Sequence, residues 1–296
     1  DFYDGDGDGQ YNPVDKNGNG EWDVDEDHPD LLGDETAWCV YTDGQPGAQR
    51  TRFAGVNPQG VEVRQTVFAY ASKGPLGNMI FIRYRLKNSG LVANVLDSVY
   101  FAAWADPDLG AEHEDDLVGI DVPRNAGYTY NGDDNDAGGY GKQVPCFMID
   151  FFLGPIAYVP GETFTDNNGN GTYDDGIDQP ITTGYSYRGQ LLGIKEFPGA
   201  KNLPASSFVH YQNGNPERGD PNTEFEARNY MEGKLKLGGL IDPCNDAVGT
   251  VKGGVNCATV DPRFWYSGDP VANNGQGSGW INTVPTDHRQ MTNVGP

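Results

Sequence analysis

The chain has 296 residues, a formal net charge of −23 and a pI of about 4.3. A surface this acidic repels nucleic acid and anionic membranes, which argues against both as partners. No stretch approaches the roughly 20 apolar residues that a transmembrane helix needs, so we expect no membrane insertion. The 42 glycines and 20 prolines favour frequent turns over long helices.

The first feature along the chain is a pair of calcium-type loops within residues 4–26. In such a loop, oxygen ligands stand at positions 1, 3, 5, 7 and 9, an acid at 12 and glycine at 6. With Gly9 at position 6, the first loop would use Asp4, Asp6, Asp8, the Gln10 carbonyl and Asp15. With Gly20 at position 6, the second would use Asp15, Asn17, Asn19, the Glu21 carbonyl, Asp23 and Glu26. Either Asp15 bridges two ions, or the first loop takes a ligand from elsewhere.

Neither loop has the flanking helices of an EF-hand, because three residues precede Asp4 and His28-Pro29 follows Glu26 closely. This argues against a calcium sensor that opens a groove. We expect calcium to hold this glycine- and aspartate-rich segment in one fixed conformation.

Strand patterns begin after residue 50, and residues 1–50 read as loops. Period-2 patterns predict strands over 61–70, 78–87, 95–105 and 147–152. The pattern over residues 78–87 is the clearest, and it predicts a strand with one apolar face and one solvent-exposed face. Its apolar face holds Ile80, Ile82, Tyr84 and Leu86, and its solvent-exposed face holds Arg83, Arg85 and Lys87.

A second acidic cluster follows the strand that ends near Trp104. Five aspartates within sixteen positions could close around a cation, and the favoured ligands are Asp106, Asp108, Asp116 and Asp121. The alternative is a solvated acidic loop. Residues 131–136 form a similar but weaker pattern.

A third calcium-type loop begins at Asp166. Its ligands would be Asp166, Asn168, Asn170, the Thr172 carbonyl and Asp174. Position 12 is Ile177, so the closing acid has to be Asp175, Asp178 or Glu162, and Asp178 is the one we include in the site. The three loops and the second cluster together predict about three or four calcium ions.

The remaining third of the chain predicts one more strand over 184–197 and one short helix after Asp220-Pro221-Asn222-Thr223. Residues 237–280 read as loops. No cysteine pair has zinc-site spacing. Cys244 and Cys257 bracket a glycine-rich loop and predict a disulfide; Cys39 with Cys146 is a weaker pair, and either could instead be a buried free thiol.

Short strands and long loops predict a mainly β fold with an antiparallel β-sandwich core. We divide the chain into a calcium-loop segment (1–50), the first half of the sandwich (51–160), the third loop (161–180) and the remaining strands, helix and loops (181–296). These segments are expected to form one compact domain.

Five segments in this order carry a resemblance: Gly33–Tyr41, Trp104–Asp121, Gly127–Asp133, Asp150–Pro155 and Gly268–Val271. They resemble parts of a group of large, poorly characterised secreted proteins of Bacteroidota-like bacteria, which carry EF-hand-like or dockerin-like calcium loops. Those proteins are often exported by the type IX system with a C-terminal sorting domain. The resemblance covers most of the chain and implies an extracellular or cell-surface location and a multidomain origin, so we expect this chain to be a fragment. The group has no established activity.

The four histidines are scattered, and no Gly-x-Ser-x-Gly elbow or His-Glu-x-x-His motif occurs, so we expect no enzyme. The leading hypothesis is a secreted, calcium-binding structural protein that assembles with itself into an extracellular lattice, tube, sheath or filament. The alternatives are a calcium-dependent adhesin for extracellular polysaccharide and, third, an extracellular hydrolase, because paired carboxylates are abundant.

Overall fold

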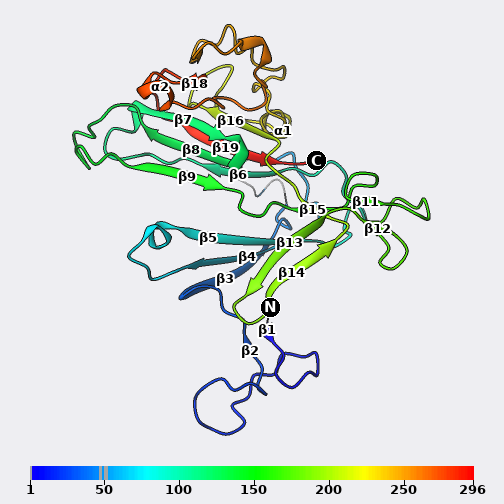
Figure 1. Ribbon diagram of the computed structural model, residues 1–296. Coiled ribbons are helices and arrows are strands. Elements are labelled where there is room, and N and C mark those ends of the chain that lie inside the picture. The colour runs from blue at the N-terminus through cyan, green and yellow to red at the C-terminus, as the bar shows by residue number, and fades with distance from the viewer. Residues whose placement is uncertain (1, 47–48, 50–52) are drawn as a thin grey trace. The chain divides into compact units, whose positions relative to one another are not determined.

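The computed structural model describes residues 2–46, 49 and 53–296 (Figure 1). Its fold is mainly β, as the sequence predicts, with 34% of residues in strands and 9% in helices. Contacts divide the chain into two units that alternate along the sequence. Unit 1 comprises Asp1–Pro46, Pro58–Val95 and Ile156–Asn202, and unit 2 comprises Gly47–Asn57, Leu96–Pro155 and Leu203–Pro296. This grouping differs from the four consecutive segments above, whose first boundary, at residues 50 and 51, lies outside the described residues.

Unit 1 is built on a three-stranded antiparallel sheet in the order β3-β4-β5. Its strands are β3 (Glu35–Thr42), β4 (Val61–Ala69) and β5 (Ile80–Asn88), and a short 3-10 helix, η2 (Pro75–Asn78), precedes β5. The sequence analysis treated β3 as loop, which is wrong. Every residue of β3 is exposed, so the strand lacks the buried alternate positions that a period-2 pattern needs.

The two faces of β5 are reversed relative to the prediction. Ile80 is 72% exposed and Tyr84 is 53% exposed, so the apolar face is the open one. The opposite face carries Phe81, which stacks on Phe68 with ring centroids 5.1 Å apart. Arg83 lies on that face and donates to the carbonyls of Tyr187 (3.2 Å) and Arg188 (2.7 Å). Hydrogen bonds to backbone carbonyls offset part of the cost of burying an arginine, and alternation alone cannot reveal such carbonyls.

The rest of unit 1 consists of short antiparallel pairs. They are β1 (Phe2–Tyr3) with β2 (His28–Pro29), β10 (Ile156–Ala157) with β15 (Lys201–Asn202), and β11 (Phe164–Thr165) with β12 (Gln179–Pro180). The strand predicted over 184–197 is a hairpin of β13 (Thr183–Gly189) and β14 (Gly193–Pro198), with an irregular register between Tyr187 and Gly189.

Unit 2 contains two three-stranded antiparallel sheets that pack face to face (Figure 1). One has the order β7-β8-β9, from β7 (Asp116–Asp121), β8 (Ala126–Asn131) and β9 (Cys146–Asp150). The other has the order β16-β19-β6, from β6 (Phe101–Ala105), β16 (Ser207–Tyr211) and β19 (Arg289–Val294). A Cβ at Gly127 would lie 2.4 Å from Thr292 Oγ1 and 2.6 Å from a Phe208 ring carbon. Glycine therefore permits the close approach of the sheets.

Helices and one further antiparallel strand pair complete unit 2. The predicted helix is α1 (Glu224–Met231), and Thr223 caps it by accepting from the amide of Glu226 (3.2 Å). The antiparallel pair joins β17 (Gly249–Lys252) to β18 (Gly279–Asn282). The other helices of unit 2 are short: α2 (Ala272–Gly275) and the 3-10 helices η3 (His113–Asp115), η4 (Val122–Arg124) and η5 (Cys257–Thr259). No helix in the described part of the chain has the length and apolar character to cross a membrane.

One of the two cysteine predictions is confirmed. Cys244 and Cys257 form a disulfide in unit 2. Cys39 in unit 1 and Cys146 in unit 2 are free and exposed, so the weaker pair and the buried-thiol alternative are both wrong. Both thiols lie on strands, β3 and β9, at positions that face away from the packed interior.

The apolar core is distributed unequally between the units. Among the described residues, the main cluster of buried apolar side chains lies in unit 2 and includes Phe208, Tyr230, Trp265 and Trp280. Unit 1 buries few apolar side chains, namely Leu32, Phe68, Phe164 and Ala200. Because small domains gain most of their stability from apolar burial, unit 1 needs another source of stability.

A chain of buried polar groups crosses the core of unit 2. His210 Nδ1 lies 2.8 Å from His288 Nδ1, and His210 Nε2 lies 3.1 Å from the Tyr266 hydroxyl. Arg218 donates to that hydroxyl (3.0 Å) and to Asp246 (2.7 Å). Burial lowers the pKa of His288 to about 4 and holds the pKa of His210 well below its usual value. Two charged rings could not share this contact, because both facing nitrogens would be donors.

Acid should therefore destabilise unit 2. An unfolded chain protonates its histidines near pH 6.5, whereas folded His288 resists protonation down to about pH 4. The unfolded state thus binds more protons as the pH falls between these values, and the free energy of unfolding decreases. At about 1.4 kcal/mol per pKa unit, we expect His288 to account for a loss of up to about 3 kcal/mol.

Urea titrations at pH 7, 5.5 and 4.5 check this expectation. His288→Gln should reduce the pH dependence and leave the share of His210, whose pKa burial also lowers; His113→Gln is the control. Burial raises the pKa of Asp116 to about 7, which acts in the opposite direction, and comparing chains that all keep Asp116 cancels that contribution. Equal pH dependence in the wild-type chain and His288→Gln would contradict the prediction.

Candidate metal centres

In the second loop, Asp15 organises the turn through the backbone. Its Oδ1 accepts from the amide of Gly18 (2.6 Å) and its Oδ2 from the amide of Gly20 (2.8 Å). Both glycines have positive φ values, 73° and 78°, which favour glycine. The hydrogen bond from Gly20 lowers the pKa of Asp15, so the carboxylate is ionised at neutral pH. Both carboxylate oxygens of Asp15 therefore accept hydrogen bonds from amides of the second loop.

The second loop is closed by Glu26, which is 1% exposed. Its Oε1 accepts from the amide of Lys16, at position 2, and its Oε2 accepts from the amide of Asp23, at position 9 (3.3 Å). One carboxylate thus bridges both ends of the loop. This arrangement brings the position-12 acid to the ligand side chains.

The third loop repeats this closure with Asp178. Its Oδ1 accepts from the amide of Asn167, at position 2 (2.8 Å), and its Oδ2 from the amide of Asp174, at position 9 (2.8 Å). Among the three candidate acids, Asp178 therefore occupies the closing place, one position later than the motif. Glu162 instead pairs with Lys201, and Ile177 is 56% exposed.

The first loop is closed by Asp27, a residue that the sequence analysis did not include. Asp27 is 2% exposed. Its Oδ1 accepts from the amide of Gly5, at position 2 (3.0 Å), and its Oδ2 from the amide of Asn12, at position 9 (3.0 Å). The first loop thus takes its acid from beyond the second loop, which is nested inside it. The adjacent acids Glu26 and Asp27 are the sequence signal for this nesting.

The first loop concentrates negative charge. Carboxylate oxygens of Asp4, Asp6, Asp8 and Asp27 all lie within 4.8 Å of one another. At such distances two unit charges repel by roughly 1 kcal/mol in water and about 4 kcal/mol at an effective dielectric constant of 20. A nearby cation is Lys16, whose Nζ lies 3.8 Å from Asp6 Oδ2. A hard, oxygen-preferring divalent ion such as calcium fits this donor set.

In the second and third loops, asparagines replace two of these carboxylates. The side-chain amides of Asn17 and Asn19 both donate to Asp23 Oδ2 (2.5 and 3.0 Å). Asn168 and Asn170 donate to Asp174 Oδ2 in the same way (2.8 and 2.7 Å). Positions 3, 5 and 9 therefore converge in both loops, with carbonyl oxygens on the asparagine side chains that suit calcium.

The remaining ligand positions also repeat. At position 1, Asp4 and Asp166 accept from the amides of the fourth and sixth residues, as Asp15 does. The position-7 residues follow one rule: each amide donates to the position-5 side chain at 2.7–2.8 Å. These residues are Gln10, Glu21 and Thr172.

An aromatic residue stands at the eighth position of every loop, a repeat that the sequence analysis missed. The residues are Tyr11, Trp22 and Tyr173. Each packs on another ring of unit 1, with centroid distances of 5.2 Å to Phe2, 5.5 Å to His28 and 5.6 Å to Tyr158. These contacts attach the loops to neighbouring segments of unit 1.

The second acidic cluster, in unit 2, assembles differently from the prediction. Asp106 and Asp108 come together with Asp287, within 4.8 Å. Arg289 already supplies a cation there, 3.2 Å from Asp106 and 3.1 Å from Asp287. We therefore assign this cluster to an arginine-centred ion network.

The other two predicted ligands of this cluster have separate structural tasks. Asp116 is buried and accepts from the amide of Leu109 (3.2 Å). Asp121 caps η4 and pairs with Arg124. In the weaker 131–136 segment, Asp136 accepts from the amides of Ala111 (2.8 Å) and Tyr140 (2.6 Å).

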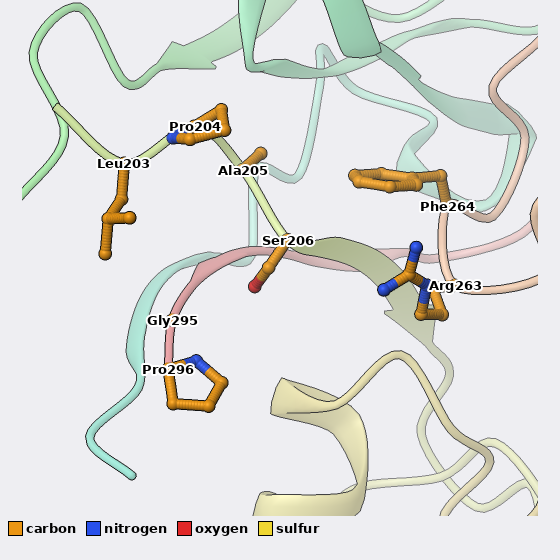
Figure 2. Close-up of a pocket in the computed structure, with 8 residues that line it drawn as sticks. All are labelled: Leu203, Pro204, Ala205, Ser206, Arg263, Phe264, Gly295 and Pro296. Carbon is orange, nitrogen blue, oxygen red and sulfur yellow. The ribbon is translucent and has the colours of Figure 1, made fainter. Parts of the chain in front are cut away.

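Unit 2 also contains an open pocket of about 280 Å³ (Figure 2). Its lining residues are Leu203, Pro204, Ala205, Ser206, Arg263, Phe264, Gly295 and Pro296. Arg263 is held by Asp261 (2.7 Å), and the Ser206 hydroxyl donates to the Asn293 carbonyl (3.4 Å). The polar groups of this pocket are thus occupied by neighbouring residues, and the three loops stay the stronger candidates.

The chain matches no family model, no curated protein and no solved structure. The functional argument therefore depends on the sites themselves.

Asp27→Asn should weaken calcium binding at the first loop. A charge-assisted contact to a closing acid is worth about 1.5–3 kcal/mol, so we expect the Kd of one site to rise by about tenfold or more. Isothermal titration with calcium measures it. The control is Asp25→Asn, which makes the same charge change at a side chain that is 68% exposed. Equal Kd values for the two variants would contradict the role of Asp27.

Gly5→Ala tests the nesting of the first two loops. A Cβ at Gly5 would lie 2.4 Å from the Glu26 carbonyl oxygen and 2.5 Å from its amide nitrogen. Backbone cannot yield as a flexible side chain does, and such overpacking costs about 1–3 kcal/mol. We expect two calcium sites to weaken together while the third titrates normally. Gly55→Ala, whose Cβ meets nothing within 4 Å, is the control. Loss of a single site would show that the loops are independent.

Proposed function

We propose that this chain is a secreted, calcium-binding structural protein that assembles with itself into an extracellular lattice, tube, sheath or filament. The calcium-binding part of this proposal is supported by one observation: all three loops are closed by the same pair of hydrogen bonds. In each, one buried or nearly buried carboxylate accepts from the amides of positions 2 and 9. Loops of this kind with rigid, oxygen-rich donor sets suit calcium at extracellular concentrations.

The location of the loops supports a structural role. All three belong to unit 1, where few apolar side chains are buried. A ligand that binds the folded state stabilises it by mass action, by about 2.7 kcal/mol at one hundred times its Kd. Calcium would thus supply unit 1 with stability that its small apolar core does not provide.

The exposed face of the β3-β4-β5 sheet supports assembly. The cross-strand register places Ile82 and Tyr84 of β5 on the same face as Val67 and Cys39. Large apolar side chains there stay open to solvent, and β3 is an edge strand with every residue exposed. Exposed apolar patches and long open edges are typical of protein contacts.

The second candidate function is a calcium-dependent polysaccharide adhesin. Tyr41 and Tyr84 lie on the open face and are 47% and 53% exposed. Exposed aromatic rings can stack on sugars. Glycan-array binding that a chelator abolishes would favour this function, and a blank array would count against it.

Calcium removal tests the proposed function. Electron microscopy of the native secreted material before and after EGTA should show ordered polymers that disperse. The melting temperature should fall by several degrees, because 1 kcal/mol corresponds to about 2–4 °C for a chain of 150–250 residues. Returning calcium, but not magnesium, should restore both. The proposal would be contradicted if EGTA changed neither the polymers nor the melting temperature.

A further inference from the structure

The edge of strand β3 that faces away from β4 has no partner strand. In the sheet order β3-β4-β5, β3 lies at one side (Figure 1), and no other strand in the described part of the chain pairs with it. Every residue of β3 is exposed. An unpaired edge presents a row of backbone donors and acceptors that can pair with another chain. This edge is therefore a surface that a further strand can extend.

The ladder between β3 and β4 shows which backbone groups face this edge. Just beyond the last pair of the register, the Asp43 amide donates to the Val61 carbonyl (3.1 Å). Hydrogen-bonded and non-hydrogen-bonded pairs alternate along an antiparallel ladder, so the odd-numbered residues of β3 bond to β4. The amides and carbonyls of the even-numbered residues point outward, and these residues are Thr36, Trp38, Val40 and Thr42.

Strand β3 carries none of the features that usually keep edge strands apart. Natural edges are protected by lysine, other charges, proline or a bulge. Residues 36–42 hold neither a charge nor a proline, and their register with β4 runs without a break. The opposite edge strand of the same sheet, β5, carries Arg83, Arg85 and Lys87. In a chain with a net charge of −23, two copies approach at least electrostatic cost where the surface is uncharged.

We propose that β3 pairs antiparallel with β3 of a second copy, so that two three-stranded sheets become one continuous sheet. This contact rests on the proposed self-assembly and names its surface. A second copy fits because a two-fold axis brings the same uncharged edge to both sides of the contact. Main-chain hydrogen bonds supply the affinity in such contacts, and side chains supply the specificity. Because a two-fold pair closes on itself, it forms the repeating unit of the polymer.

The outward residues select one register for this pair. An axis at Cys39 sets every outward residue opposite another outward residue. Thr36 then lies opposite Thr42 of the second copy, and Trp38 lies opposite Val40 in the same way. An axis moved to Trp38 or to Val40 leaves one outward residue beyond the end of the opposing strand. An axis between two residues sets outward groups against inward ones, which forms no ladder.

The thiol of Cys39 can report this register. Cys39 is free and exposed. At the axis, Cys39 meets Cys39 of the second copy as a non-hydrogen-bonded pair, in which the Cα atoms lie about 4.5 Å apart. A disulfide spans Cα distances of about 4.4–6.8 Å. The two thiols of the pair are therefore within bonding distance.

Oxidation of the native thiols is the first test. Diamide, added to wild-type chain in calcium, takes one proton and one electron from each of two thiols as a disulfide forms and is itself reduced to a hydrazine. We expect a dimer on non-reducing gels, joined through Cys39 by mass spectrometry of its peptides. Cys39→Ser should abolish this dimer, whereas Cys146→Ser, which removes the other exposed thiol, should keep it. Equal cross-linking of Cys39→Ser and wild-type chain would overturn the contact.

A matched pair of charge variants tests the register without the thiol. Trp38 is 65% exposed and Val40 is 42% exposed. Trp38→Lys with Val40→Lys sets like charges opposite each other, whereas Trp38→Lys with Val40→Glu sets opposite charges there. We expect the first to dimerise about tenfold more weakly by sedimentation velocity. General repulsion predicts the reverse order, because the variant with two lysines is the less acidic one. Circular dichroism checks that both variants fold.

The outcomes separate this contact from the proposed function. Polymers in calcium without a Cys39 cross-link overturn the contact alone. A dimer linked through Cys39, in chain that forms no polymer, overturns the proposed polymer and supports the contact. Chain that stays monomeric and forms no cross-link overturns both. Equal affinities of the two charge variants show that the edge takes another register or another partner, and they overturn the proposed pairing.

Discussion

The hydrogen bonds from two backbone amides to one closing carboxylate are the interaction on which unit 1 depends. Glu26, Asp27 and Asp178 each join the second and ninth positions of a loop. These bonds join distant positions of each loop, whereas the bonds to Asp4, Asp15 and Asp166 are local to one turn. Ionised acceptors make such bonds stronger than neutral ones. The same bonds place several oxygens close together, which makes a bound cation favourable.

The two units solve the problem of stability in different ways. Unit 2 packs aromatic side chains such as Trp265 and Trp280 into one buried cluster and adds a disulfide. It tolerates a buried polar chain from Asp246 to His288 because most members have a hydrogen-bond partner. Unit 1 buries little apolar surface and places its loops and its open sheet face at the surface. Features suited to ligands and partners thus gather in the unit with the smaller core.

The proposed calcium binding and assembly reinforce each other in this arrangement. Calcium would neutralise loop carboxylates that otherwise repel neighbouring copies. A polymer built in this way is sensitive to both calcium and salt, since exposed charge interactions are screened within about 8 Å at physiological ionic strength. The apolar face around Ile82 and Tyr84 adds a contribution that salt does not screen.

Local sequence patterns determined a large part of this protein. The loop positions follow from spacing, because the ligands of a calcium-type loop lie within twelve residues. Strands β4 and β5, the cap of α1 and the Cys244–Cys257 disulfide are likewise encoded by neighbouring residues. The mainly β class follows from the same patterns.

Tertiary structure decided what depends on distant groups. Asp27 closes the first loop because the nested second loop returns the chain to Gly5, which linear spacing does not show. The open face of β5 is the apolar one because carbonyls of a hairpin a hundred residues away accept from Arg83. His210 and His288 meet because β16 and β19 pair. A sequence specifies which groups can bond, but the partners that a fold brings from far along the chain decide which of them do.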